Sequence, residues 1–138
     1  MLKSNELYVL DSYALIVFFK HSEGWQEVDQ LISSASQSGR KLLMSLINWG
    51  EVYYTRIVDV NKEQAEWTEK VIEQFPITII APDLDMTRQA AIFKAMGGIS
   101  YADCFAAALA VQENAILVTG DPEFKKFEKL GHLKIKWI

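Results

Sequence analysis

The chain has 138 residues, of which 50% are hydrophobic and 12% aromatic, so it is long enough to bury one core and too apolar for a disordered protein. Its net charge of −4 argues against a strongly cationic coat for nucleic acid, although acids that hold divalent cations would themselves lower the charge. The single cysteine, Cys104, excludes an internal disulfide and a cysteine-based zinc site within one chain. We therefore expect one domain over residues 1–138, in the reducing cytoplasm.

The stretch from Leu7 to Phe19 is largely apolar, as the core of a signal peptide or a membrane span is. It is shorter than the roughly 20 apolar residues that a bilayer helix needs. It also carries Asp11 in its middle, and no small-residue cleavage site follows it. We expect this stretch to be buried core, in a soluble protein without membrane association.

Five short apolar runs predict the strands of a sheet. In chain order they are Leu7–Leu10, Lys41–Ser45, Ile77–Ala81, Ala115–Thr119 and Leu133–Trp137. The last run alternates apolar residues with lysines, as an edge strand does. Helical patterns connect the runs, over Ser12–Lys20, Gly24–Ser38, Trp49–Val58, Lys62–Phe75, Asp85–Met96, Tyr101–Glu113 and Phe124–Leu130. This alternation predicts an α/β fold, a three-layer αβα sandwich around a parallel sheet that binds ligands at the carboxyl ends of its strands.

Four acids lie at the ends of these elements. Asp11 directly follows the first strand, Glu51 comes soon after the second, and Asp121 follows the fourth. Asp103 opens the alanine-rich helix that leads into the fourth strand. Because parallel strands place their carboxyl ends on one edge of a sheet, the four acids can converge on one pocket.

Helix capping is the alternative explanation for each acid taken alone. Asp11 and Asp121 stand where N-cap residues stand, the second of them before a proline. Glu51 follows Asn48, and Asp103 follows Ser100, at the spacing of a capping box. Only Asp11, at the end of a buried strand, is poorly explained by capping alone.

Taken together, the acids favour a metal site. Four unpaired carboxylates in one pocket would repel one another and raise each other's pKa, and divalent cations relieve that repulsion. A site made of carboxylates alone favours Mg²⁺ or Mn²⁺ over zinc or copper.

Four segments together resemble the PIN domain family, and in particular the small VapC-like toxins of toxin–antitoxin pairs. They are residues 9–15 (VLDSYAL), 45–52 (SLINWGEV), 99–110 (ISYADCFAAALA) and 115–124 (AILVTGDPEF). The resemblance implies a five-stranded parallel sheet, RNA cleavage with Mg²⁺ or Mn²⁺, a homodimer, and inhibition by an antitoxin protein.

The resemblance also implies roles for individual residues. Asp11, Glu51 and Asp103 match the family's first three acids, and Asp121 matches the usual fourth, as catalytic and metal-binding residues. Ser12 and Thr119 match polar positions that support the site, and Glu123 is a weaker candidate for a further acid. The sequence departs from many members around Asp121, where it has Gly120 and Pro122.

We therefore expect an endoribonuclease in which acid-bound metal activates a water for attack on an RNA phosphodiester. Lys20, Arg40, Lys41, Arg56 and Lys94, with Lys125, Lys126 and Lys129 on one short helix, are candidate RNA contacts, although each also fits an ordinary surface charge. A PIN-fold binding or regulatory module without nuclease activity is the alternative. A phosphotransfer receiver domain or a haloacid-dehalogenase-type phosphatase would need a second acid beside Asp11, which the sequence lacks.

Overall fold

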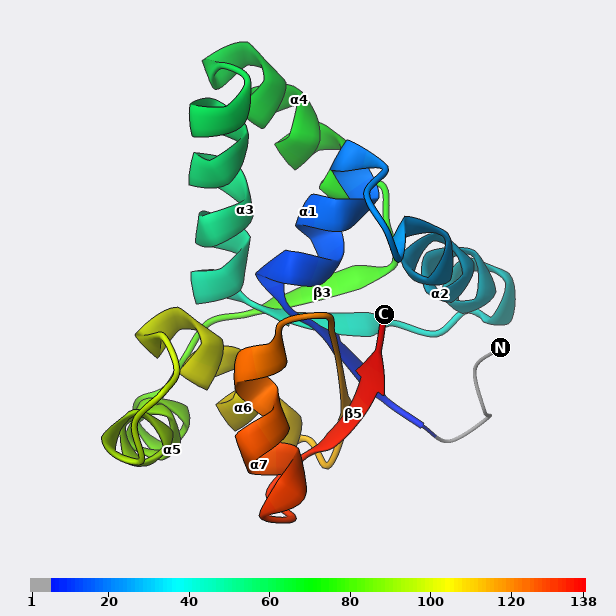
Figure 1. Ribbon diagram of the computed structural model, residues 1–138. Coiled ribbons are helices and arrows are strands. Elements are labelled where there is room, and N and C mark those ends of the chain that lie inside the picture. The colour runs from blue at the N-terminus through cyan, green and yellow to red at the C-terminus, as the bar shows by residue number, and fades with distance from the viewer. Residues whose placement is uncertain (1–5) are drawn as a thin grey trace.

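The computed structural model describes residues 6–138 (Figure 1), so the first five residues of the expected domain lie outside the described part. Its strands are β1 (Tyr8–Leu10), β2 (Leu42–Ser45), β3 (Ile77–Ile80), β4 (Ile116–Thr119) and β5 (Lys134–Trp137). Its helices are α1 (Ser12–Lys20), α2 (Trp25–Ser38), α3 (Leu46–Asp59), α4 (Lys62–Glu73), α5 (Leu84–Ala95), α6 (Tyr101–Gln112), the 3₁₀ turn η1 (Pro122–Phe124) and α7 (Lys125–Lys129).

The five strands form one sheet in the order β3-β2-β1-β4-β5, and every neighbouring pair is parallel. From central β1 the chain moves outward through β2 to β3, then crosses to the other side of β1 for β4 and β5. The strand order therefore reverses between β1 and β4, and the carboxyl ends of these two strands form the switch point where open α/β sheets bind ligands.

Helices cover both faces of the sheet (Figure 1). On one face, Val9, Leu43 and Leu117 pack with buried residues of α5, α6 and α7. On the other face, Leu10 and Met44 pack with buried residues of α1, α2, α3 and α4. Successive side chains of a strand point to opposite faces, so each strand contributes to both cores. The three-layer αβα sandwich that the sequence predicts is confirmed.

The element boundaries differ from the prediction in one place that matters for the site. Helix α3 begins at Leu46, three residues before the predicted start at Trp49, because the Ser45 side chain caps it by accepting a hydrogen bond from the Ile47 amide. Asn48 and Glu51 consequently both lie inside the helix, on neighbouring turns. The capping-box interpretation of these two residues is wrong.

Other local predictions are confirmed. The alternating strand β5 is an edge strand, beside β4. Gly131, with a φ of 80°, follows the C-cap of α7 in the left-handed region. Within residues 6–138, no helix combines the length and apolar character needed to cross a bilayer.

Candidate metal centre

Asp11 lies at the base of the site, at the carboxyl end of central β1. Its Oδ1 accepts a hydrogen bond of 2.9 Å from the Ala14 amide, so it does cap α1. Capping uses only that oxygen. The residue is completely buried, and its Oδ2 has no hydrogen-bond partner among the described residues. A buried carboxylate oxygen without a donor is strongly unfavourable unless a cation compensates its charge.

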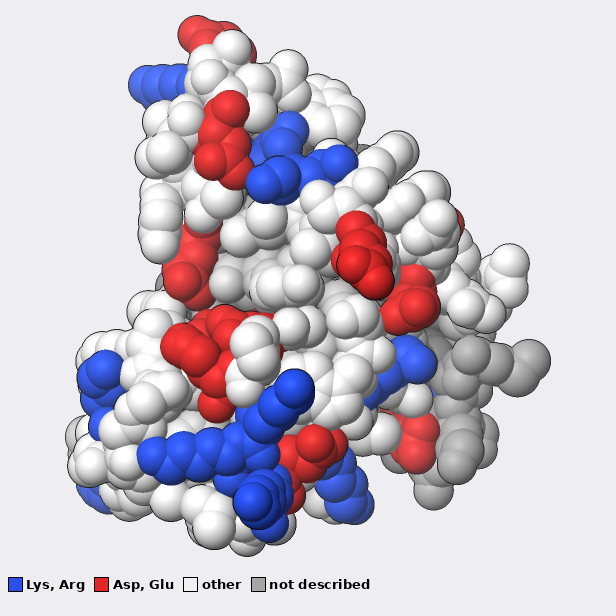
Figure 2. All heavy atoms as spheres, in the orientation of Figure 1, with Lys and Arg blue, Asp and Glu red and all other residues white. Residues whose placement is uncertain are grey.

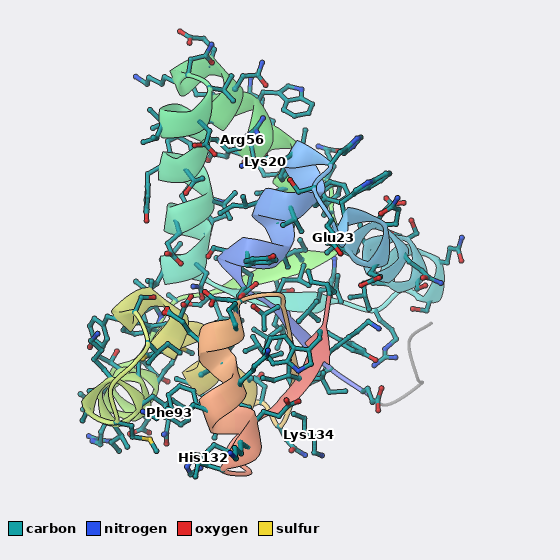
Figure 3. All side chains as sticks on the ribbon, viewed as in Figure 1. Lys20, Glu23, Arg56, Phe93, His132 and Lys134 are labelled. Atoms are coloured by element: carbon teal, nitrogen blue, oxygen red, sulfur yellow. The ribbon has the colours of Figure 1, made fainter. Side chains whose placement is uncertain are left out.

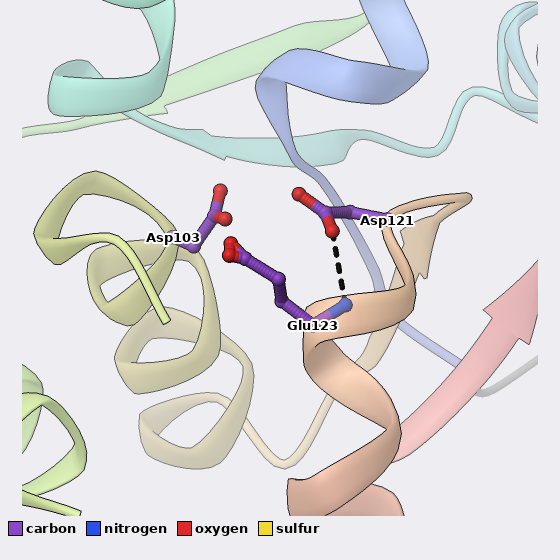
Figure 4. Close-up of side chains that lie close together, drawn as sticks. All are labelled: Asp103, Asp121 and Glu123. Atoms are coloured by element: carbon purple, nitrogen blue, oxygen red, sulfur yellow. Dashed lines mark hydrogen bonds between the residues drawn. The ribbon is translucent and has the colours of Figure 1, made fainter. Parts of the chain in front are cut away.

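Three acids from α6 and the segment after β4 come together above the sheet edge (Figure 4). Asp103, Asp121 and Glu123 each offer one carboxylate oxygen, and these oxygens all lie within 4.8 Å of one another. Asp103 is buried, with its amide held by the Ser100 hydroxyl oxygen at 3.3 Å. Two N-cap contacts expected from the sequence are therefore present. Ser100 accepts from the Asp103 amide, and Asp121 accepts a hydrogen bond of 3.0 Å from the Glu123 amide. The Glu123 side chain, a weaker candidate from the sequence, is the exposed member of this group.

Glu51 reaches the site from α3 and is held there by two donors. Its Oε1 accepts a hydrogen bond of 2.9 Å from the Ser12 hydroxyl and one of 3.1 Å from the Asn48 side-chain amide. Neither bond uses Oε2. Glu51 lies outside the group of oxygens within 4.8 Å but lines the same cleft.

Thr119 and Gly120 determine where Asp121 points. The Thr119 hydroxyl oxygen, which is fully buried, accepts a hydrogen bond of 3.0 Å from the Asp121 amide. A Cβ atom on Gly120 would lie 2.3 Å from Tyr13 Cε1 and 2.9 Å from the Ile138 carbonyl oxygen. Only glycine therefore fits this close approach. The Gly120-Asp121-Pro122 departure from the family pattern still directs Asp121 into the cleft.

Glu51, Asp103, Asp121 and Glu123 line an open cleft of about 490 Å³ at the carboxyl edge of the sheet, whereas the fully buried Asp11 is not among the lining residues. Its remaining walls come mainly from α1 and contain Ser12, Tyr13, Ile16, Val17, Lys20, Ser22 and Ser100. Figure 2 shows acidic side chains gathered beside α6 and the start of α7, with basic side chains over α7 next to them. Lys20 is the one cation that the described part of the chain places in the cleft wall.

Burial and mutual repulsion make two of the acids hard to ionise. Burial raises the pKa of Asp11 from 3.8 to about 8, opposed in part by the Thr119 hydroxyl and the Ala14 amide, with Asp103 and Asp121 adding repulsion. Burial also raises the pKa of Asp103 to about 7, with repulsion from Asp121 as the next cause and a smaller contribution from Glu51. Both shifts favour the protonated forms in the absence of a cation.

These residues fit a hard divalent cation. The donors are carboxylate oxygens, which Mg²⁺ and Mn²⁺ prefer, and the unpartnered Asp11 oxygen is at the same edge. A positive charge there would favour the ionised forms of Asp11 and Asp103, whose pKa values are raised by burial and, less strongly, by mutual repulsion. Histidine is absent from the cleft lining, which disfavours a zinc site of the usual kind.

Several cations that were candidates for RNA contact have structural roles instead. Arg56 is buried and donates a hydrogen bond to the Thr68 hydroxyl, near Lys20 at the end of α1 (Figure 3). Lys94 donates to the Ile99 carbonyl at 2.8 Å. Lys126 donates to the Met96 and Gly97 carbonyls at 2.6 and 2.7 Å. The two lysines thus donate hydrogen bonds to backbone carbonyls of the loop between α5 and α6.

Comparison with known families agrees with this architecture. The sequence profile of the PIN domain family matches residues 8–130, which include every acid described above. The chain belongs to the PIN domain family. Among curated proteins, no sequence is significantly similar to this PIN domain.

Solved structures show the same fold. A chain of VapBC2 from Rickettsia felis, bound to a DNA fragment from its promoter, superposes with a TM-score of 0.72 at 20% identity, covering 96% of this chain and 98% of that chain. VapBC-1 from nontypeable Haemophilus influenzae gives 0.68 at 21% identity, covering 95% and 97%. Mycobacterium tuberculosis VapC20, described as a Sarcin-Ricin loop cleaving toxin, gives 0.68 at 11% identity, covering 86% and 93%.

Proposed function

We propose that this PIN domain is a Mg²⁺- or Mn²⁺-dependent endoribonuclease and the toxin of a toxin–antitoxin pair. The observation that carries the proposal is the group formed by Asp103, Asp121 and Glu123, whose oxygens lie within 4.8 Å of one another at the same sheet edge as the unpartnered Oδ2 of Asp11. A non-catalytic binding module gains nothing from such a repulsive group. A metal-dependent nuclease requires it.

Each acid has a proposed role. Asp11 and Asp103, the most buried of the set, are the principal metal ligands, and Asp121 and Glu51 complete the coordination or act through water. Glu123 is a further ligand candidate because it shares the oxygen group with Asp103 and Asp121. When bound, Mg²⁺ activates a water for attack on phosphorus and neutralises charge that develops on the phosphate oxygens.

Polar groups in and beside the cleft orient these acids or contact the substrate. The Thr119 hydroxyl holds the Asp121 amide and favours the ionised form of Asp11. Ser12 holds Glu51 from the other side. Lys20, whose Nζ lies 3.7 Å from Asp59 Oδ2, is the cation in the cleft wall that can bind a phosphate of the RNA backbone. Its surface ion pair is weak enough to exchange for a phosphate contact.

Protein partners form the second part of the proposal. Structures of the same fold include a toxin–antitoxin complex from Klebsiella pneumoniae and a member of the VapBC family of toxin–antitoxin systems from Mycobacterium tuberculosis, which supports a cognate antitoxin for this chain. The α3–α4 hairpin exposes Tyr54, Val58 and Trp67, apolar side chains suited to an antitoxin or to a homodimer contact. An antitoxin-controlled toxin of this kind would act in the cytoplasm.

RNA cleavage by purified protein tests the proposal. Total RNA is incubated with wild type and with the Asp11→Asn and Asp103→Asn variants, in Mn²⁺ or in chelator. We expect cleavage only by wild type with Mn²⁺, and a loss of more than about 100-fold in each variant, since removal of outer ligand supports alone costs about 10–100-fold. Asp83→Asn is the matched control, because Asp83 caps α5 through the Met86 amide, away from the cleft. Full activity in both Asp11→Asn and Asp103→Asn contradicts the proposal, and absence of Mn²⁺ binding favours the binding-module alternative.

A further inference from the structure

Asn48 occupies an unusual position between two elements of the site. It lies on α3, one helical turn before Glu51, and is completely buried. Its Nδ2 is 3.1 Å from Glu51 Oε1 and 3.1 Å from the carbonyl oxygen of Ala102, the residue before Asp103 on α6. One nitrogen thus joins the helix that carries Glu51 to the first turn of the helix that carries Asp103.

The chemistry of this contact requires an amide. Both neighbours of Nδ2 are acceptors, so the group between them must donate twice, and a primary amide is the neutral side chain that carries two N–H bonds on one atom. The same two acceptors fix the orientation of the amide, because the opposite orientation would place Oδ1 against both of them. An aspartate of the same shape would bring repulsion in place of both bonds.

The other end of Asn48 shows that packing alone does not explain this residue. Its Oδ1 is buried and has no hydrogen-bond partner among the described residues. A buried acceptor without a donor destabilises a fold, and a leucine of similar shape would leave no unsatisfied atom. The two bonds made by Nδ2 therefore distinguish Asn48 from an apolar residue at this position.

We infer that Asn48 is a positioning residue, which holds the Glu51 carboxylate at a fixed place beside Asp103 so that the two can share one cation site. Asn48 and Ser12 both donate to Oε1 of Glu51, and Oε2 remains the oxygen for the cation. Ser12 fixes Glu51 relative to the β1 end, and Asn48 fixes it relative to α6. This inference rests on the proposed metal-dependent function and extends it to a residue that is itself no ligand.

The first test uses metal-free protein, so that it is independent of the proposed function. Side-chain amide signals of Asn48 are assigned by NMR with the Asn48→Leu variant and followed in wild type and in Glu51→Ala. We expect slow hydrogen exchange at the Asn48 amide in wild type, and at least a several-fold faster exchange together with shifted signals in Glu51→Ala. Unchanged exchange and unchanged signals in Glu51→Ala would overturn the positioning role.

The second test measures Mn²⁺ affinity by calorimetry in wild type, Asn48→Leu, Asn48→Asp and Asn48→Ser. We expect about a 10–100-fold weaker affinity in the leucine and aspartate variants and an intermediate value for serine, which keeps one donor. Thr68→Val is the matched control, since Thr68 is a buried polar residue that donates to Gln64 at 2.7 Å in α4. It should lose stability without loss of Mn²⁺ affinity.

Wild-type Mn²⁺ affinity in folded Asn48→Leu overturns the inference, and the serine variant supplies the comparison if the leucine variant does not fold. A wild type that binds no Mn²⁺ contradicts the proposed function, and the NMR result then decides the role of Asn48 alone.

Discussion

Ser12 and Glu51 are 39 residues apart in the chain and are joined by a hydrogen bond of 2.9 Å from Ser12 Oγ to Glu51 Oε1. Ser12 directly follows Asp11, and Glu51 lies on the helix that follows β2, so this bond connects the carboxyl ends of two neighbouring strands. It positions a carboxylate of α3 along the cleft that Asp103 and Asp121 also line.

Replacing Ser12 by alanine should weaken the metal site while leaving the fold intact. Glu51 would lose its connection to the β1 end and keep only the Asn48 donor. We expect Mn²⁺ affinity to fall about 10-fold, the lower end of the effect of removing a group that orients a ligand. Calorimetry measures it. Ser38→Ala is the matched control, because the Ser38 hydroxyl donates to the Ser34 carbonyl on α2, outside the cleft lining. Equal affinity in Ser12→Ala and Ser38→Ala would show that the bond does not orient Glu51 for metal.

The stability of metal-free protein should fall as pH rises. The folded-state pKa values of Asp11 and Asp103, about 8 and about 7, lie above their ordinary value of 3.8. Their contribution to stability is therefore fully present below about pH 4 and is lost as pH rises through 7 and 8. Thermal unfolding in chelator should show a lower Tm at pH 8.5 than at pH 5, by about 5 °C or more.

The Asp103→Asn variant checks the cause of that pH dependence. It removes one of the two acids and part of the repulsion on Asp11, so its Tm should exceed that of wild type at pH 8.5 and differ little at pH 5. Asp83→Asn, on the exposed cap of α5, should leave the pH profile unchanged. If Tm depends on pH in Asp103→Asn as it does in wild type, these acids do not determine the pH dependence of stability.

Divalent cations should restore the lost stability, and more so at high pH. Binding to the folded state alone stabilises it by about 2.7 kcal/mol at 100 times Kd. Because the cation competes with protons on Asp11 and Asp103, the rise in Tm at a fixed Mg²⁺ concentration should be larger at pH 8.5 than at pH 5.5. Thermal scans with Mg²⁺ and with chelator measure this difference. An equal rise at both pH values would place the cation away from these acids.

A methyl group at Gly120 should disturb the site, whereas one at Gly50 should not. The added Cβ at Gly120 would lie 2.3 Å from the Tyr13 ring and 2.9 Å from the Ile138 carbonyl, so the chain beside Asp121 must shift. We expect Gly120→Ala to destabilise the fold by about 1–3 kcal/mol. Gly50 lies inside α3 with no neighbour within 4 Å of an added Cβ, so Gly50→Ala should raise helix stability by about 1 kcal/mol. Denaturant unfolding measures the free energy of unfolding of Gly120→Ala and of Gly50→Ala. Similar stability in both variants would contradict the close approach at Gly120.

The sequence predicts the fold because its signals are local and agree with one another. Apolar runs, helical spacing and the alternation of β5 each depend on neighbouring residues, and the structure confirms them. The positions of Asp11 and Asp121 could likewise be predicted, since both follow strands on either side of the switch point. Glu51 and Asp103 are also predicted from their places after the second strand and at the start of the alanine-rich helix, but their exact placement depends on how α3 and α6 pack.

The contacts that the sequence did not reveal are long-range. The spacing of Asn48 to Glu51 predicts a capping box, and nothing local indicates that Asn48 reaches Ala102, 54 residues away. From the sequence Glu123 is only a weaker candidate, because the direction of its side chain depends on the η1 turn, which Pro122 and the Asp121 cap produce together. The Asp-Pro-Glu sequence of that turn is the local signal that brings Glu123 close to Asp121. The buried position of Arg56, which donates to Thr68 between α3 and α4, is likewise set by packing and not by its own segment.

The most direct test of the metal centre is a crystal structure of the protein soaked in Mn²⁺, with data collected for anomalous scattering. We predict an anomalous peak within about 2.2 Å of carboxylate oxygens of Asp103 and of at least one of Asp11 and Asp121. The peak should be absent in crystals of Asp103→Asn. A cleft without a peak at saturating Mn²⁺, or a peak that persists unchanged in Asp103→Asn, would contradict the assignment of these acids as a metal-binding nuclease centre.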